Sequence, residues 1–247
     1  MMLTNLLLAT LLNAEAIGGY AAGCLQNGVA LPLTGPGYQV IRTKRLRYYG
    51  HPTLISYLQT LANQTRMAGL PDLYIADLAM ARGGPFTTGH RSHQTGLDAD
   101  IWFRMANRPI GKGEQDSPAE WPLINERRYQ VHPGRFGPQQ LTLLRLAASK
   151  PEVARIFINP VLKAQVCKQA STEPWVAKLR PWVGHFSHFH VRLHCPIGSP
   201  QCEPQAEIPA GNGCGEELDA WLKDKPQLPN VSGINKVPTL PARCQQP

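Results

Sequence analysis

The stretch His90-Arg91-Ser92-His93-Gln94-Thr95-Gly96-Leu97-Asp98-Ala99-Asp100 decides how this chain is interpreted. It combines histidines and carboxylates around a glycine, and a second window, His188-Phe189-His190, adds two histidines far downstream. The chain has 8 histidines, and five of them lie in or beside these windows: His90, His93, His185, His188 and His190. Histidines scattered through a core would not gather in this way, so we interpret the two windows as parts of one site.

Alternation of polar and apolar residues predicts that both windows enter β-strands. Residues 98–103 alternate, which places two aspartates, the second of them Asp100, on one face of a strand. Residues 188–194 alternate as well, so the two histidines of that window share a face. A glycine before the first strand is available for the turn that returns His93 toward Asp100. These patterns predict β-strands that carry the functional side chains.

Two imidazoles and one carboxylate form an ordinary ligand set for catalytic zinc, which keeps one position open for water. We therefore predict that His93, Asp100 and His190 bind Zn2+. His90 lies in a glycine-rich loop, where it is either a further contact to metal or substrate or a plain loop residue. Asp98 shares a strand face with Asp100, and we interpret it as a supporting group because three protein ligands suffice. The ligand set indicates a zinc hydrolase.

A hydrolase of this kind needs a general base, and no H-E-x-x-H motif supplies one. His188 lies beside the predicted ligand His190 and is the predicted base. His185 is placed to stabilise an oxyanion, the alternative being an exposed residue before a strand. Ser92 is disfavoured as a nucleophile because no G-x-S-x-G signature surrounds it. The three other histidines are predicted to be structural or surface residues: His51, His132 and His194.

The composition is that of a globular protein with a basic surface. The chain has 247 residues, of which 43% are hydrophobic, and a formal net charge of +8. This length suits one decorated domain or two small ones. Nucleic acid, anionic lipid and an acidic cell-wall polymer all fit the charge, but a nucleic-acid binder leaves the histidine windows unexplained. The one basic cluster, Arg42-Thr43-Lys44-Arg45-Leu46-Arg47, is either a solvated surface or a polyanion contact.

The cysteines and the N-terminus predict export to an oxidising compartment. The 6 cysteines form no C-x-x-C pair, and four of them lie in the proline-rich segment from residue 195 onward, which favours disulfides. Residues 3–12 are an apolar run too short to span a bilayer, and Ala14-Glu15-Ala16 has the form of a signal cleavage site. We predict a signal peptide over residues 1–16, although no Lys or Arg precedes Arg42, and no integral membrane segment. A lipid anchor at Cys24 is disfavoured because this cysteine lies well beyond the apolar run.

Apolar periodicity predicts the other elements. Helices are expected over residues 52–67, 138–149, 160–170 and 216–222, and strands over residues 72–80 and 155–159. Residues 24–47 are predicted to be irregular, and residues 104–137 to form a long surface excursion. The whole pattern predicts an α+β fold in which helices and long disulfide-tied loops flank the sheet.

Three motifs make the chain similar to a known group of enzymes: Gly89-His90-Arg91-Ser92-His93-Gln94-Thr95-Gly96-Leu97-Asp98, Arg155-Ile156-Phe157-Ile158-Asn159-Pro160 and His185-Phe186-Ser187-His188-Phe189-His190. With them, the chain resembles the metallopeptidases that include lysostaphin-type enzymes, D-alanyl-D-alanine carboxypeptidases and the hedgehog amino-terminal domain. Within that group it is similar to the penicillin-insensitive murein endopeptidases over residues 24–244. The Asp-x-x-His pair that a family relative carries is absent from residues 127–130, so a second metal site is not expected.

The resemblance implies a periplasmic, penicillin-insensitive enzyme that hydrolyses D-alanyl-meso-diaminopimelyl crosslinks of peptidoglycan. It implies a small antiparallel sheet that carries the ligands, with zinc on His93, Asp100 and His190 and with His90 as a further ligand. It also implies that His185 and His188 are the catalytic pair. The nine prolines and four cysteines from residue 195 onward predict a tethered proline-rich extension over residues 196–247, after a zinc peptidase domain over residues 17–195. By the same resemblance, the disulfides are Cys24–Cys244, Cys167–Cys214 and Cys195–Cys202, whereas the cysteine spacing alone leaves the pairing open.

Two other functions remain as alternatives. A zinc D,D- or L,D-carboxypeptidase would use the same ligands on a free peptide end, and Arg91 or Arg192 would hold the terminal carboxylate. A wall-binding protein that retains zinc without turnover would need neither His185 nor His188, and their presence disfavours it.

Overall fold

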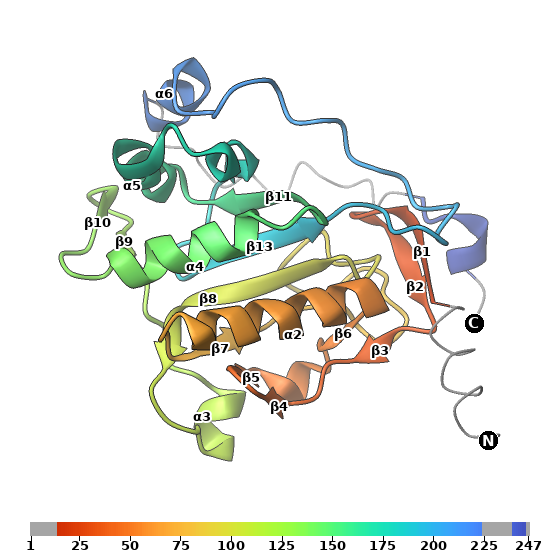
Figure 1. The fold of residues 1–247 in the computed structure, drawn as a ribbon. Coiled ribbons are helices and arrows are strands. Elements are labelled where there is room, and N and C mark those ends of the chain that lie inside the picture. The colour runs from red at the N-terminus through yellow and green to blue at the C-terminus, as the bar shows by residue number, and fades with distance from the viewer. Residues whose placement is uncertain (1–13, 224–238, 246–247) are drawn as a thin grey trace.

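The computed structural model describes residues 14–223 and 239–245 and has the predicted α+β architecture (Figure 1). One mixed sheet runs through the centre of the described part of the chain. Its strands follow the order β12 (Leu179–Pro181), β11 (Val153–Ile158), β13 (His188–Leu193), β8 (Asp98–Ala106), β7 (Asp72–Ile75), β5 (Tyr38–Val40) and β4 (Thr34–Gly35). The four central strands, from β11 to β7, pair antiparallel as predicted, whereas the pairs β11–β12 and β5–β7 are parallel.

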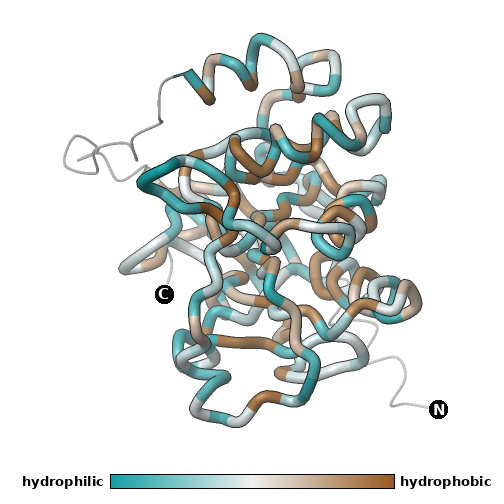
Figure 2. Tube along the Cα trace, turned by 90° about the vertical axis from the view of Figure 1, so that its left-hand side faces the viewer, coloured by the Kyte–Doolittle hydropathy of each residue, from teal (hydrophilic) through white to brown (hydrophobic). Residues whose placement is uncertain are grey.

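Two long helices cover one face of this sheet, and loops and short helices border the other. Helices α2 (Pro52–Met67) and α4 (Pro138–Ala148) lie side by side across β8 and β13 (Figure 1). The strand residues beneath them are apolar and fully buried, among them Ile101, Phe103 and Val191. Apolar residues therefore gather in the middle of the molecule, and hydrophilic residues occupy the outer loops (Figure 2). The alternate residues of the same strands point to the opposite face, where the polar windows lie.

Two helices have the predicted bounds, and local signals define where they start. Helix α2 begins after His51, whose side chain accepts a hydrogen bond from the Thr53 backbone, and Pro52 occupies its first turn. Helix α5 (Pro160–Ala170) begins in the same way, with Asn159 accepting from the Val161 backbone. Helix α4 ends one residue before its predicted end, and α6 (Glu216–Lys223) extends one residue beyond.

The prediction of an irregular segment over residues 24–47 is wrong. This segment holds part of β2 (Ala22–Gln26), which pairs with β1 (Glu15–Gly19), and also β3 (Val29–Ala30), β4, β5 and the 3-10 helix η1 (Thr43–Arg45). Strand β3 pairs with β6 (Tyr49–Gly50), a partner some twenty residues away in the sequence. Strands of two or three residues are too short to show alternation. Their pairing with other segments, and not their own sequence, determines that they form strands.

Three further bounds differ from the predictions. Strand β7 ends at Ile75 rather than at residue 80, because the chain then leaves the sheet and Ala79 forms an isolated bridge with Tyr49. Strand β8 continues to Ala106, and the excursion after it contains α3 (Lys112–Asp116), β9 (Ile124–Asn125) and β10 (Gln130–Val131). Strands β11 and β13 differ from their predicted ranges by at most two residues.

The C-terminal extension is tied to the rest of the chain by covalent bonds. The structure contains the disulfides Cys24–Cys244, Cys167–Cys214 and Cys195–Cys202, the pairings that the resemblance implied. The first bond holds the 3-10 helix η4 (Ala242–Cys244) against the β1–β2 hairpin (Figure 1). The second joins α5 to the segment that precedes α6. The 3-10 helix η2 (Pro174–Lys178) follows α5. Within the described residues, no helix is long and apolar enough to cross a membrane.

Candidate metal centre

The register of two neighbouring strands brings the two sequence windows together. Strands β8 and β13 are antiparallel, with His190 opposite Asp100 and His188 opposite Trp102. Residues that face each other in such a pair have side chains on the same side of the sheet. The carboxylate of the first window and the imidazoles of the second therefore share the face that the helices leave open.

A loop with left-handed backbone brings the other two histidines to this face. His93 has φ 70° and Gly96 has φ 70°. A Cβ at Gly96 would lie 2.6 Å from a methyl carbon of Leu25 and 2.9 Å from the backbone nitrogen of His51, so only glycine fits there. The His93 backbone N–H donates to Asp98 Oδ2 at 2.9 Å. The predicted turn thus exists, and it is held in place by the first residue of β8.

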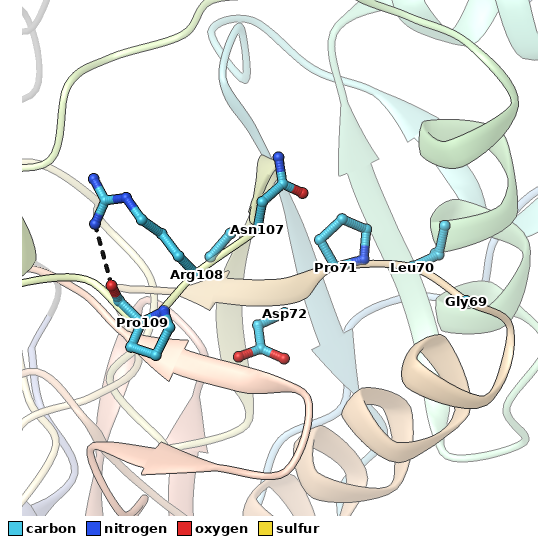
Figure 3. Close-up of a pocket in the computed structure, with 8 residues that line it drawn as sticks. Gly69, Leu70, Pro71, Asp72, Asn107, Arg108 and Pro109 are labelled. Atoms are coloured by element: carbon cyan, nitrogen blue, oxygen red, sulfur yellow. Dashed lines mark hydrogen bonds between the residues drawn. The ribbon is translucent and has the colours of Figure 1, made fainter.

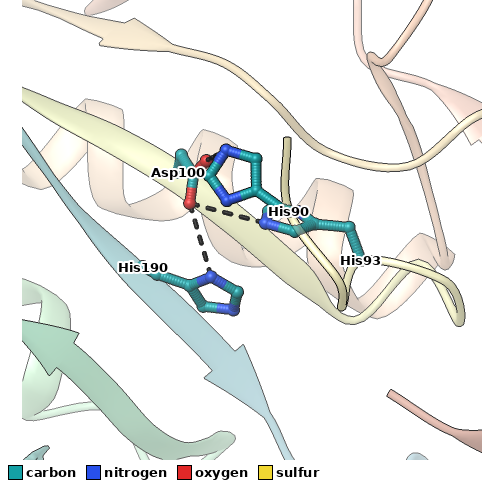
Figure 4. A group of neighbouring side chains, drawn as sticks. All are labelled: His90, His93, Asp100 and His190. Carbon is teal, nitrogen blue, oxygen red and sulfur yellow. Dashed lines mark ion pairs between the residues drawn. The ribbon is translucent and has the colours of Figure 1, made fainter. Parts of the chain in front are cut away.

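Four side chains converge on one point, as Figure 4 shows: His90, His93, Asp100 and His190. One donor atom of each lies within 4.8 Å of the others, close enough for the group to hold a metal ion. Asp100 lies at the centre: its Oδ2 is 3.1 Å from His90 Nε2, and its Oδ1 is 3.5 Å from His93 Nε2 and 3.4 Å from His190 Nδ1. His93, Asp100 and His190 are almost fully buried, whereas His90 is half-buried.

The hydrogen bonding of this group fits a metal site. Both ring nitrogens of His93 and Oδ1 of Asp100 are buried. None of these three atoms has a hydrogen-bond partner among the described residues. An unsatisfied buried polar atom costs about 1 to 3 kcal/mol. A bound cation would satisfy the Asp100 oxygen and one of the two His93 nitrogens, because the carboxylate and the imidazole nitrogen are its ordinary donors.

Asp98 supports the group from the side. Arg192 donates to both of its carboxylate oxygens, from Nε at 2.8 Å and from Nη2 at 3.0 Å. Nε2 of His190 lies 3.1 Å from Asp98 Oδ1, which leaves Nδ1 of the same ring facing Asp100. A carboxylate on the far nitrogen fixes the orientation of a metal-binding imidazole. The supporting role predicted for Asp98 therefore agrees with its contacts.

Burial and charge set the protonation of the group. Burial alone would raise the pKa of Asp100, but His90, His188 and His93 outweigh it and hold this pKa well below its ordinary value. Burial lowers the pKa of His190 to about 4. A charged carboxylate beside a neutral imidazole is the state in which both bind a metal ion.

The two remaining histidines of the windows lie directly beside this group. His188 Nε2 is 3.7 Å from Asp100 Oδ1, and the rings of His185 and His188 are 5.1 Å apart. Burial lowers the pKa of His188, and burial followed by the neighbouring His188 and His190 lowers the pKa of His185 well below its ordinary value. His185 is therefore not the exposed residue that the sequence left open, but part of the cluster.

A second left-handed turn presents His185. Its φ is 55°, it follows Gly184 with φ 71°, and its Nδ1 lies 2.9 Å from the carbonyl oxygen of Val183. Asn159 Nδ2 donates to the Gly184 carbonyl at 2.9 Å, so the start of α5 anchors this turn. A non-glycine residue in this conformation costs about 1 to 3 kcal/mol and clusters at functional sites. The anchor Asn159 was not predicted, because only the folded chain brings it to Gly184.

The basic cluster of residues 42–47 pairs largely with carboxylates, while residues 44–46 remain exposed. Arg45 and Arg47 both donate to Oδ2 of the buried Asp77, at 2.9 Å and 3.0 Å. Lys44 lies 3.1 Å from Asp116, and the guanidinium of Arg42 lies 4.9 Å from the Trp102 ring centroid. Asp77 was not among the predicted residues. Its backbone carbonyl accepts from the Asp100 N–H at 3.0 Å and so holds β8 in place at the site.

The three histidines predicted to lie outside the site do so. His51 is buried at the start of α2, where its side chain caps the helix. His132 is half-buried in the excursion, and His194 is exposed after β13. None of them is among the four residues that converge at the metal centre.

A surface pocket at the other end of the sheet is separate from this centre. It is lined by residues 69–72 and 106–109, as Figure 3 shows. Asp100 and Ala106 are six residue steps apart along β8, which corresponds to about 20 Å. Asp72 Oδ2, in the wall of this pocket, accepts from Gln39 Nε2 at 3.2 Å, so this carboxylate oxygen already has a partner. The converging histidines, not this pocket, therefore define the candidate site.

Comparison with known proteins agrees with the geometry. The family model described as penicillin-insensitive murein endopeptidase matches residues 16–246. A protein of that name from Haemophilus influenzae is 44% identical over 234 residues, which cover 94% of this chain and 82% of that protein. Another from Klebsiella pneumoniae is 42% identical over 235 residues, covering 94% and 85%. One from Yersinia enterocolitica is 40% identical over 233 residues, covering 94% and 84%. This chain belongs to the penicillin-insensitive murein endopeptidase family.

Proposed function

We propose that this protein is a zinc-dependent murein endopeptidase that hydrolyses D-alanyl-meso-diaminopimelyl crosslinks in peptidoglycan. The observation that carries this proposal is the convergence of His90, His93, Asp100 and His190, with buried donor atoms that have no hydrogen-bond partner among the described residues. Membership of the family supports the substrate, because the relatives are named for action on murein. The proposal therefore rests on a buried set of metal-binding side chains and on membership of a peptidase family.

In this proposal, His93, Asp100 and His190 hold zinc, and His90 is a further ligand. Their donor atoms lie close together, and two imidazoles with one carboxylate are a common catalytic zinc set. Zinc bound there supplies a polarised carbonyl and an acidified water at neutral pH. Asp98 keeps His190 oriented through its second ring nitrogen, at 3.1 Å.

His188 and His185 are the proposed catalytic pair. His188 shares a strand face with His190 and lies 3.7 Å from Asp100, so it borders the ligands without being needed as one. Its imidazole accepts the proton of the attacking water and returns it to the leaving amine. The ring of His185 lies 5.1 Å from that of His188 and 6.2 Å from that of His190. Because its Nδ1–H faces the Val183 carbonyl, it would donate to the developing oxyanion through Nε2, in its protonated form.

The mechanism uses no serine nucleophile, and penicillin insensitivity follows from this. Penicillin inactivates by acylating a nucleophilic serine. Ser92 lies next to the proposed ligand His93, in a loop whose geometry serves to place the imidazoles. We therefore expect that penicillin does not block turnover.

The carboxypeptidase alternative loses one of its two candidate arginines. It needs a cation to hold a terminal carboxylate, and Arg192 was one candidate. Its guanidinium is buried, bound to both oxygens of Asp98, and lies 4.1 Å from the Tyr20 ring centroid. Arg192 is thus committed inside the protein, and this favours cleavage within a crosslink over cleavage at a free end.

We further propose that the protein acts in the periplasm after removal of a signal peptide. Disulfides between distant segments suit an oxidising compartment. Strand β1 begins at Glu15, and the Ala16 backbone donates to Ser199 Oγ at 3.0 Å. Because cleavage after Ala16 would divide this strand, we place processing at or before its start. The proposed peptidase domain continues to residue 195, and the disulfides tether the proposed extension over residues 196–247.

The decisive experiment is a muropeptide profile of crosslinked sacculi digested by the mature protein, with and without a chelator. We expect crosslinked dimers to be converted into tetrapeptide monomers, activity to be lost with the chelator, and zinc to restore it. Release of terminal D-alanine with intact dimers would favour the carboxypeptidase instead. Binding to sacculi without any cleavage would favour a non-catalytic wall-binding protein.

A further inference from the structure

Three aromatic rings form a continuous row that starts at the metal centre. The ring of Phe157 lies 5.3 Å from that of His190, Trp182 lies 5.7 Å from Phe157, and Trp221 lies 5.9 Å from Trp182. We call Phe157, Trp182 and Trp221 the aromatic shelf. Aromatic pairs prefer centroid distances of about 4.5 to 7 Å, so the row consists of true ring contacts.

Strand register places the shelf on the same face of the sheet as the metal ligands. Phe157 on β11 lies opposite His190 on β13 and is paired with Arg180 on β12. Trp182 follows Arg180 by two residues, so it continues on this face, and its backbone N–H donates to the Ile158 carbonyl at 2.9 Å. Neighbouring strands are about 4.8 Å apart, so the shelf begins one strand beyond His190.

The middle ring of the shelf is open to solvent. Trp182 is 47% exposed, and it is the one aromatic among the exposed large hydrophobic side chains of the described residues. Phe157 and Trp221 are half-buried. A tryptophan left in water beside a buried catalytic centre forgoes the stabilisation of burial and marks a binding surface. Trp182 also begins the turn that carries His185, which makes the shelf continuous with the site.

The shelf is held rigidly although its members come from distant parts of the chain. Helix α6 carries Trp221, and its buried Leu218 packs into the protein. Glu217 on the same helix forms an ion pair with Arg180, the residue that precedes Trp182 on its strand face. The Cys167–Cys214 disulfide fixes the segment just before α6. A surface organised before binding loses little entropy when a ligand arrives.

We propose that the aromatic shelf binds an amino sugar of the glycan strand to which the crosslinked peptide is attached, an inference that rests on the proposed function. The flat C–H face of a pyranose ring matches an exposed indole, while its hydroxyl and acetamido groups stay in water. An extended peptide fits worse, because ring faces offer no partner to its backbone amides.

The length of the peptide stem fits this arrangement. Four residues separate the scissile bond from the sugar in a tetrapeptide stem, and an extended chain covers at most about 3.6 Å per residue, or about 14 Å in total. The shelf runs outward from His190 in ring-to-ring steps of 5.3, 5.7 and 5.9 Å. A peptide cut at the metal centre therefore reaches the exposed rings with its sugar still attached.

The test compares two crosslinked dimers that differ in one feature: one retains its disaccharides, and in the other an amidase has removed them. For Trp182→Ala, we expect kcat/KM on the sugar-bearing dimer to fall about three- to tenfold, the range of one aromatic contact. On the sugar-free dimer it should be unchanged. Trp221→Ala should show the same selectivity, and Met67→Ala, which removes an 85% exposed side chain at the end of α2, should change neither rate.

Equal losses on both dimers, or no loss on either, would overturn the proposal. A second measurement separates it from the proposed function: binding of peptide-free glycan strands, followed by tryptophan fluorescence, needs no cleavage. The wild type should bind these strands, and Trp182→Ala should bind them at least threefold more weakly. If the wild type cleaved neither dimer, the proposed function would fail, and the binding measurement would still decide on the shelf.

Discussion

The metal centre and the aromatic shelf share one face of the sheet but are assembled by different means. The metal centre lies between two adjacent central strands, and the antiparallel register of β8 and β13 sets Asp100 against His190. The shelf lies at the edge, where a strand, a turn and a helix from the C-terminal extension meet. Backbone pairing places Asp100 and His190, and a left-handed loop adds His90 and His93. At the shelf, a disulfide and an ion pair hold α6 in place.

The two regions also differ in what surrounds their side chains. At the metal centre, polar atoms of His93 and Asp100 are buried without hydrogen bonds to the described residues. At the shelf, a large apolar ring is exposed to water. Each arrangement opposes the usual distribution of polar and apolar groups, and each suits a different ligand: a cation in the first case and a sugar face in the second. Under the two proposals, the chemistry takes place at the central strands and the recognition of the sugar at the edge of the sheet.

The largest effect is expected from removal of a proposed ligand. His93→Ala should lose both metal and endopeptidase activity, because the ring is fully buried and its Nε2 faces Asp100. Metal content by mass spectrometry and a muropeptide assay should fall together. His194→Ala is the matched control, since this histidine is exposed after β13 and should change neither quantity. A His93→Ala protein with full metal content would remove His93 from the ligand set.

A smaller effect is expected from the proposed base, and it should separate chemistry from metal binding. His188→Ala should keep zinc and lose about a hundredfold or more in kcat, the usual contribution of a positioned general base. Its ring lies beside Asp100 at 3.7 Å, but the four converging donors do not include it. His132→Ala, in the excursion, is the control. Undiminished turnover in His188→Ala would exclude it from the mechanism.

The smallest effect on activity is expected from loss of the Cys167–Cys214 disulfide, which holds the segment before α6 at the edge of the sheet. Replacement of both Cys167 and Cys214 by serine should lower the free energy of unfolding by about 2 to 4 kcal/mol, while the metal content stays unchanged. The same change at Cys195 and Cys202 should cost less, because 7 residues separate that pair and 47 separate the first. Urea unfolding curves measure both. Loss of metal from the first variant would show that the edge also supports the centre.

Much of this molecule could be predicted because strong local patterns define it. Proline and a capping residue define the start of α2, and two alternating windows defined β8 and β13 to within a few residues. The short strands before residue 47 could not be predicted, because two or three residues carry no period. Asp77 and Asn159 escaped prediction for a related reason: each acts through a backbone contact with a distant segment, at Asp100 and Gly184.

The amino-acid sequence by itself determined the kind of chemistry, since only its residue types and their spacing on strands point to a buried set of imidazoles and a carboxylate. The family resemblance, also carried by sequence, pointed to the cysteine pairs that the structure contains. Tertiary structure alone decided that Arg192 is bound to Asp98 and that Trp221 lies against Trp182. The physical reason is that periodicity acts over one element, whereas contacts between elements depend on how the whole chain packs.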